Sequence, residues 1–166
     1  MIDHQPLQLL DVVEIPLAAH DRGYEVENRR ILCPHWKRVR RVTPFDITQY
    51  VETELLHQLQ EDWLSAVPFH YLKTLPVEQR RTIQIVKAND FQVFSCKPGK
   101  WKGSFSINGA CLTASITDPA LLEKLNAGYQ PSCFCLLVMS FSQPWKKPDT
   151  DDIQRCYRLI AGVIEL

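Results

Sequence analysis

Residues 101–117 read Trp-Lys-Gly-Ser-Phe-Ser-Ile-Asn-Gly-Ala-Cys-Leu-Thr-Ala-Ser-Ile-Thr, and they indicate two β-strands joined by a tight turn. From Trp101 to Ile107, apolar or small residues alternate with polar ones, which is typical of a strand with one buried face. Asn108-Gly109 is a strong signal for a two-residue hairpin turn, because both residues tolerate the positive φ that such a turn requires. This stretch therefore predicts an antiparallel hairpin that packs on a core.

Similar patterns on both sides of this hairpin predict further strands. Pro16 would end the first of them, and residues 97–100 form a second turn signal. Asn89-Asp90 predicts a hairpin between residues 82–87 and residues 91–96. The predicted extended segments are 7–17, 30–33, 36–42, 82–87, 91–96 and 133–141, and a final apolar element follows at 157–164.

Two helices are predicted between the strands. Apolar residues recur every four positions from Ile47 to Trp63, and the run Thr43-Pro44-Phe45-Asp46 is typical of a helix start. This pattern predicts one long helix over about residues 46–65. Asp118-Pro119 opens a second, short helix over about residues 118–127, which Gly128 can close.

The length of 166 residues and the hydrophobic content of 45% fit one ordinary domain or two very small ones. Many turn-separated strands with few helices suggest small β-barrels, so we expect a mainly β (α+β) protein. The composition changes near residue 68. We therefore expect one lobe, with the long helix, at residues 1–68 and a second at 69–166, unless the chain is one compact unit.

The charge is balanced overall but unevenly distributed. Nineteen Lys and Arg cancel nineteen Asp and Glu, which excludes a histone-like or polybasic protein. Six basic and no acidic residues lie between Arg29 and Arg41, and six more lie between Arg80 and Lys102 with Asp90 as the single acid. If these two segments fold onto one face, they form a groove suited to a phosphate backbone.

These segments supply the candidate nucleic-acid contacts. Trp36 would share a strand face with Arg38 and Arg40, which favours it as a base-stacking residue, whereas Trp101 shares a face with Phe105 and is expected in the core. Alternatively, the basic side chains protect a strand edge, or the acidic helix neutralises them. The candidate residues are Arg30, Trp36, Lys37, Arg38, Arg40, Arg41, Lys97, Lys100 and Lys102.

Other chemistry is weakly indicated. Cys33-Pro-His35 and Cys133-x-Cys135 lack the usual zinc spacing, and no Cys-x-x-Cys pair occurs, so we expect structural, mostly buried thiols and neither metal nor cofactor. Phosphate-loop, nucleophile-elbow and His-Glu-x-x-His motifs are absent, so an enzyme is not expected. No signal peptide or membrane-length apolar run is visible, so we expect a cytoplasmic protein that does not bind membranes.

Several blocks resemble the bacterial dual OB-containing domain family. They are the run 9–17 with Glu27-Asn28, the run 112–119 ending in Thr-Asp-Pro, and the runs 137–145 and 156–164. Together they extend from about residue 9 to the C-terminus. The resemblance implies two successive OB-like barrels in a small bacterial cytoplasmic protein, which is suspected of binding nucleic acid in conflict or defence systems and has no catalytic motif.

The sequence also departs from this family. Members usually begin with a further segment rich in Cys, Arg and Trp-Ile-Arg-Pro-like residues, so we expect the first barrel to lack strands or to borrow them from a partner. Gln143 replaces the usual acidic residue, and the loop after Trp145 is longer. Two hypotheses follow: a non-enzymatic accessory protein that binds single-stranded RNA or DNA, or an interaction module that strand addition from a protein partner or a second copy completes.

Overall fold

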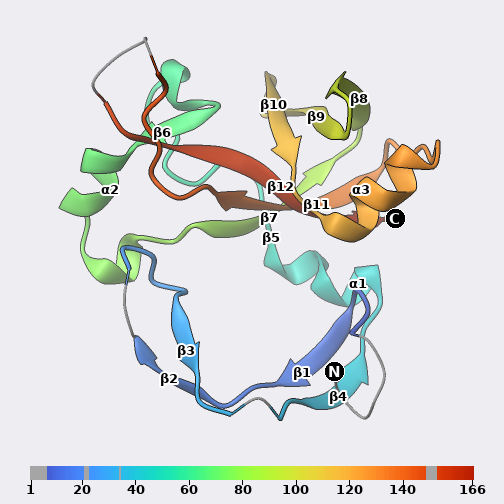
Figure 1. Ribbon diagram of the computed structural model, residues 1–166, viewed down its shortest axis with the longest axis horizontal. Helices are drawn as coiled ribbons and strands as arrows, with labels where there is room; N and C mark the ends of the chain where they lie inside the picture. The colour runs from blue at the N-terminus through green and yellow to red at the C-terminus, as the bar shows by residue number, and fades with distance from the viewer. Residues whose placement is uncertain (1–6, 21–22, 34, 149–152) are drawn as a thin grey trace.

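The computed structural model describes residues 7–20, 23–33, 35–148 and 153–166, and it is mainly β with a few short helices (Figure 1). The strands are β1 Asp11–Glu14, β2 Leu17–His20, β3 Arg29–Ile31, β4 Lys37–Arg41, β5 Val51–Glu52, β6 Ala66–Pro68, β7 Ile83–Ala88, β8 Gln92–Lys97, β9 Lys100–Ile107, β10 Ala110–Ile116, β11 Cys135–Phe141 and β12 Arg155–Glu165. The helices are α1 Pro44–Ile47, α2 Phe69–Thr74 and α3 Pro119–Asn126, with short 3-10 turns η1 Thr48–Tyr50, η2 Glu61–Trp63 and η3 Val77–Gln79. Within these ranges no helix has the length and apolar character that crossing a membrane would need.

One large sheet contains most of the strands, in the order β5-β7-β11-β12-β10-β9-β8, and β6 pairs with β12 beside it. The pairs β5–β7 and β10–β12 are parallel, and the other pairs are antiparallel. In the described residues the first and last strands of this sheet do not pair, so it is not closed into a barrel. The remaining strands form two separate two-stranded sheets, β1–β4 and β2–β3.

The hairpin expected within residues 101–117 is confirmed. β9 and β10 pair in antiparallel register through Asn108 and Gly109, which both have positive φ (49° and 80°). The alternation along β9 also holds, because Phe105 and Ile107 are buried while Ser106 is exposed. The hairpin therefore supplies one wall of the core, with its polar residues on the opposite face.

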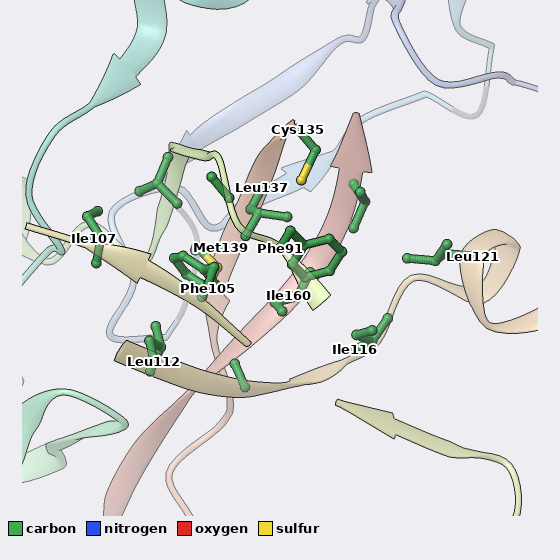
Figure 2. Packing of buried hydrophobic residues seen from close by; sticks show 14 of the residues in the cluster. Phe91, Phe105, Ile107, Leu112, Ile116, Leu121, Cys135, Leu137, Met139 and Ile160 are labelled. Atoms are coloured by element: carbon green, nitrogen blue, oxygen red, sulfur yellow. The ribbon is translucent and has the colours of Figure 1, made fainter. Parts of the chain in front are cut away.

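The core lies between the strands of the large sheet and the helix α3. Figure 2 shows Phe91, Phe105, Met139 and Ile160 gathered between the strands, and each of them is at most 2% exposed. Leu121 and Leu125 of α3 join the same cluster. The predicted short helix is thus confirmed, and Asp118 caps it by accepting hydrogen bonds from the N–H groups of Ala120 and Leu121 (3.0 and 3.2 Å).

The long helix predicted over residues 46–65 is wrong. The chain does start a helix at Pro44, where Asp46 Oδ2 accepts hydrogen bonds from the backbone N–H and the hydroxyl of Thr43 (2.7 and 2.8 Å). This helix ends at Ile47, and the next residues form η1, the short strand β5 and a series of turns. Of the apolar stripe that suggested the helix, only Leu55 is buried, whereas Leu59 is 65% exposed.

Two buried polar side chains from the large sheet explain this difference. Gln84 of β7 accepts a hydrogen bond from the N–H of Leu56 (2.8 Å) and donates one to the carbonyl of Glu54 (2.9 Å). Arg158 of β12 donates to the carbonyls of Leu56, Trp63 and Leu64 at 2.7, 3.4 and 2.8 Å. These contacts satisfy backbone groups that a helix would have paired internally, so tertiary contacts override the local helical preference.

Two strand predictions are also corrected. The segment 7–17 forms no single strand, because Ile15 and Pro16 interrupt it and β1 and β2 join different sheets. The strands around Asn89-Asp90 exist, but β7 pairs with β5 and β11, whereas β8 pairs with β9. Asp90 Oδ1 accepts a hydrogen bond from the N–H of Ser106 (2.8 Å), which links the turn at residues 89–90 to β9.

The N-terminal strands are joined to the large sheet by residues 23–28. Tyr24 is buried with Val67, Leu72 and Cys156 in a second, smaller core, and its hydroxyl donates to the carbonyl of Ser142 (3.2 Å). β5 and β6 lie within residues 1–68 yet pair with strands that follow residue 68. A division of the chain at residue 68 stays a prediction.

Candidate nucleic-acid interface

The basic strand β4 is partly neutralised from within the protein. Arg38 and Arg41 each place Nε beside a carboxylate oxygen of Asp11 on the paired strand β1, at 3.2 and 3.1 Å. The Asp11 side chain is only 1% exposed. The hydrogen bond from the backbone N–H of Gln8 (2.9 Å) and these two guanidinium groups hold the pKa of Asp11 below its usual value. Arg38 and Arg41 therefore already have an anionic partner.

The other candidates in the N-terminal part are more accessible, with one exception. Arg30, Lys37 and Arg40 are exposed on β3 and β4. Trp36 is half-buried, and its indole N–H is buried without a hydrogen-bond partner in the described part of the chain. Its N–H edge is covered by protein, which leaves less of the ring available for stacking. Trp101, which was expected in the core, is half-buried at its edge: the side chain packs against the core and donates to Asn126 Oδ1 of α3 (2.8 Å).

The lysines of the second basic segment lie together on the β8–β9 hairpin. Lys97 and Lys100 oppose each other beside its turn, and Lys102 opposes Phe94 on β8. Figure 1 shows this hairpin at the top of the view, whereas β4 lies at the bottom. The structure therefore brings the lysines together and brings the β4 cations together, but it does not join the two groups into one continuous track.

A row of side chains extends from this hairpin across the outer face of the large sheet. Phe94, Lys102, Ser115 and Leu159 occupy paired positions on the four neighbouring strands β8, β9, β10 and β12. Their neighbours along the strands, such as Gly103, point into the core, so this row lies on the opposite face. Phe94 is 42% exposed.

The row leads to an open hollow of about 570 Å³. It lies where β12 changes its pairing partner from β6, which it meets over Arg155–Tyr157, to β10, which it meets from Leu159 onward. Because β6 and β10 do not meet there, the hollow opens between Ser65, which precedes β6, and Thr113 of β10. Lys102 and Arg158 are the only charged residues in the described lining, and no carboxylate lies among them.

Two aromatic residues form one wall of the hollow. Trp145 is 50% exposed, and its ring centroid lies 5.7 Å from that of Tyr157, with the rings tilted by 59°. Trp145 exchanges two backbone hydrogen bonds with Arg155, of 2.9 and 3.0 Å, which fix its position beside β12. Sequence reasoning missed both residues as site candidates. The run Trp145-Lys146-Lys147, which repeats the aromatic-then-basic pattern of Trp36-Lys37-Arg38, was the available signal.

Arg158 is the most unusual charged group of this region. It is 4% exposed, its guanidinium lies 4.8 Å from the centroid of Phe141, and it donates hydrogen bonds to the backbone carbonyls of Leu56, Trp63 and Leu64. Burial lowers the pKa of Arg158 to about 10, which leaves it charged at neutral pH. Its positive charge faces these carbonyl oxygens and the Phe141 ring.

The thiols are unpaired and only partly as expected. Cys135 and Cys156 are buried, but Cys96, Cys111 and Cys133 are exposed, so the prediction of mostly buried thiols is wrong for these three. They lie on the outer side of strands or in a turn, where the alternation places side chains away from the core. Cys33 Sγ lies 3.3 Å from His35 Nδ1, yet the described residues hold no group of three metal-ligating side chains.

Comparison with known proteins identifies one family. A family model described as "Dual OB-containing domain" matches residues 1–163, which is nearly the whole chain. No curated protein and no solved structure matches the chain significantly.

Proposed function

The chain belongs to the dual OB-containing domain family, and from this premise we propose that it is a non-enzymatic nucleic-acid-binding accessory protein. OB folds are common modules for single-stranded nucleic acid, which they bind with a positively charged groove and aromatic stacking residues. In our proposal the binding surface is the β8–β9 hairpin together with the adjoining outer face of the large sheet, and the ligand is single-stranded RNA or DNA.

One observation carries this proposal: the lysines of the hairpin share a surface with exposed aromatic rings. Lys102 lies directly opposite Phe94 and also lines the hollow that holds Trp145. Lys97 and Lys100 continue the positive charge to the tip of the hairpin. Lysines there can contact successive phosphates while the rings stack on bases, which gives salt-sensitive binding with little sequence preference.

The strand β4 has a smaller part in the proposal. Arg38 and Arg41 would have to leave Asp11 to bind phosphate, so their contribution is reduced. Lys37 and Arg40 of β4 remain as exposed cations at the opposite end of the molecule, and Arg30 is exposed on β3 in a separate sheet. A strand bound along the hairpin would not need to reach them.

Fluorescence anisotropy with labelled single-stranded RNA, single-stranded DNA and duplex DNA tests the proposal at low and at physiological salt. The variant Lys97→Glu/Lys100→Glu/Lys102→Glu should weaken single-strand binding more than tenfold. It should also reduce the slope of log K against log salt by about 2, since each lost contact to a single strand removes about 0.7. The matched control, Arg30→Glu/Lys37→Glu/Arg40→Glu, has the same change in charge and should have a smaller effect. If the unaltered protein binds none of the three ligands at low salt, the proposal fails.

We place this activity in a bacterial conflict or defence system, and the suspected role of the family supports that setting. Cells that carry the gene should resist phage infection better than cells that lack it. Equal plaque counts for the two strains would contradict the defence role and leave the binding activity unaffected. The triple lysine variant should lose the resistance if nucleic-acid binding underlies it.

A specific observation also favours the second candidate function, an interaction module that a protein partner or a second copy completes. In residues 7–19, 23–33 and 35–50 only Tyr24 and Val42 are buried. Eight large apolar side chains there are between 40% and 82% exposed: Leu7, Leu9, Leu17, Ile31, Leu32, Val39, Phe45 and Tyr50. Two-stranded sheets are marginally stable alone, and their open edges can accept an added strand.

Light scattering coupled to size-exclusion chromatography tests this candidate. Self-association that rises with concentration, and that Val39→Arg on β4 disrupts, would support a second copy as the added partner. A chain that stays monomeric up to about 100 μM would exclude the second copy at such concentrations and leave a different protein as the partner. If the monomeric chain keeps its N-terminal strands folded without any partner, these strands do not need an added strand, and this candidate function is contradicted.

A further inference from the structure

We propose that the hollow between β6 and β10 holds one unpaired nucleobase of the bound strand, stacked on Trp145, while Lys102 binds the adjacent phosphate. This inference rests on the proposed function and adds a defined subsite to it. The subsite requires more than attraction between opposite charges, because its ligand must contain a base that is not stacked in a duplex.

The shape of the hollow is set by the strands around it. The backbone N–H of Arg158 donates to the carbonyl of Ser65 (2.9 Å) and closes the sheet on the β6 side. On the other side, β10 pairs with β12 only from Ser115 onward. The strand edge of β10 at Thr113 therefore stays unpaired on the side of β12 and lines the hollow. The opening between β6 and β10 therefore results from strand pairing. Its volume of about 570 Å³ lies within the range of about 300–1,000 Å³ typical of small-ligand sites.

The wall of the hollow is suited to stacking. Tyr157 lies against Trp145 in a tilted arrangement and supports it, while half of the Trp145 surface remains exposed. The paired backbone hydrogen bonds with Arg155 limit the motion of Trp145. A preformed ring of this kind can stack on a base at little entropic cost.

The charge of the lining favours a nucleotide over an aromatic side chain of a peptide. Lys102 brings a positive charge to the hollow, and no carboxylate in the described lining opposes it. Arg158 is held by backbone carbonyls, so Lys102 is the cation that is free to bind phosphate. Thr113 and Ser115 add hydroxyl groups that can donate or accept, so they suit the edge of any base. We therefore expect little preference for base identity.

Trp145→Ala and Trp145→Phe test the inference, with Phe45→Ala as the matched control. Phe45 is 82% exposed on α1, so its replacement removes an exposed ring outside the hollow. Trp145→Ala should weaken single-strand binding about tenfold, which is the loss of one base-stacking contact. Trp145→Phe should retain most of the affinity, and Phe45→Ala should retain all of it. The salt slope of Trp145→Ala should stay unchanged, because no phosphate contact is removed.

A fluorescent base supplies a direct readout. A short single strand that contains 2-aminopurine should show quenched fluorescence on binding, since stacking on an aromatic ring quenches this base, and the quench should be lost in Trp145→Ala. If Trp145→Ala binds as tightly as the unaltered protein while the triple lysine variant loses binding, the subsite is wrong and the proposed function stands. If the unaltered protein binds no single strand, both fail.

Discussion

At the scale of single residues, Gly103 shows how closely the core is packed behind the proposed binding face. A Cβ atom at this position would lie 2.4 Å from Cε2 of Phe91 and 2.7 Å from Cδ1 of Ile160. The Phe91 ring is 2% exposed and enclosed by other core residues, so it has little room to move. Glycine is therefore required here for close approach.

We predict that Gly103→Ala lowers the free energy of unfolding by about 1–3 kcal/mol, as overpacking of a core does. Ser104→Ala is the control, because Ser104 is on the same strand and faces outward; its effect should stay below about 0.5 kcal/mol. Urea denaturation followed by circular dichroism measures both. Equal midpoints for the two variants would show that the core can absorb the extra methyl group.

His57 gives the fold a predicted dependence on pH. Burial lowers the pKa of His57 from its usual 6.5, nearby Arg158 adds to this effect, and a hydrogen bond of 2.8 Å from Nε2 to the carbonyl of Arg81 partly opposes it. Between the lowered pKa and 6.5 the unfolded chain binds more protons than the folded chain. The free energy of unfolding contributed by this group is therefore present above pH 6.5 and is lost as the pH falls below it.

Replacement of His57 tests whether this residue lowers the free energy of unfolding as the pH falls. In His57→Asn the loss of stability between about pH 7.5 and pH 5.5 should be smaller than in the unaltered protein. Asparagine is suitable because residue 57 has a φ of 59°, which asparagine tolerates better than most residues do. The comparison uses denaturation midpoints at the two pH values, and a parallel decline in both proteins would rule out His57 as the source.

At the scale of elements, the sequence predicted the turns and helix starts that depend on contacts between neighbouring residues. Asn108-Gly109 and Asp118-Pro119 specify their turn and helix start through neighbouring backbone groups, so the sequence was sufficient there. The helix prediction for the acidic segment 46–65 failed because the partners of its backbone groups, Gln84 and Arg158, lie 28 to 102 residues away in the sequence. Hydrophobic spacing contains no information about such distant hydrogen bonds.

Arg158 should therefore be essential for keeping residues 53–64 in their observed conformation. Arg158→Met would remove three hydrogen bonds and leave the carbonyls of Leu56 and Leu64 without their donors, and we predict a loss of about 2 kcal/mol in the free energy of unfolding. Limited proteolysis should then cleave within residues 53–64 first. The control Lys87→Met removes an exposed charge from β7 and should change neither result. If the segment resists protease in Arg158→Met as it does in the unaltered protein, Gln84 and Leu55 suffice to hold it.

At the scale of the whole molecule, most strands were predictable, but the pairing between strands far apart in the sequence was not. The proposed binding face combines β8, β9, β10 and β12, and β12 joins β10 only after about 40 intervening residues. The sequence identified Lys97, Lys100 and Lys102, which belong to one hairpin, whereas Trp145 and Tyr157 join them only through this long-range pairing. The ion pairs of Asp11 with Arg38 and Arg41 likewise depend on the register between β1 and β4.

The two parts of the molecule should differ in stability, and this difference separates the two candidate functions. β12 lies between β11 on one side and β6 and β10 on the other, whereas β1–β4 and β2–β3 are two-stranded and bury little apolar surface. Amides of β1 to β4 should therefore exchange with deuterium much faster than those of β11 and β12. A bound single strand should increase protection in β9 and β10, while self-association should increase it in β1 to β4. If amides in both parts of the free chain are equally protected, the N-terminal strands are stable without a partner. The instability that favours the interaction-module candidate would then be absent.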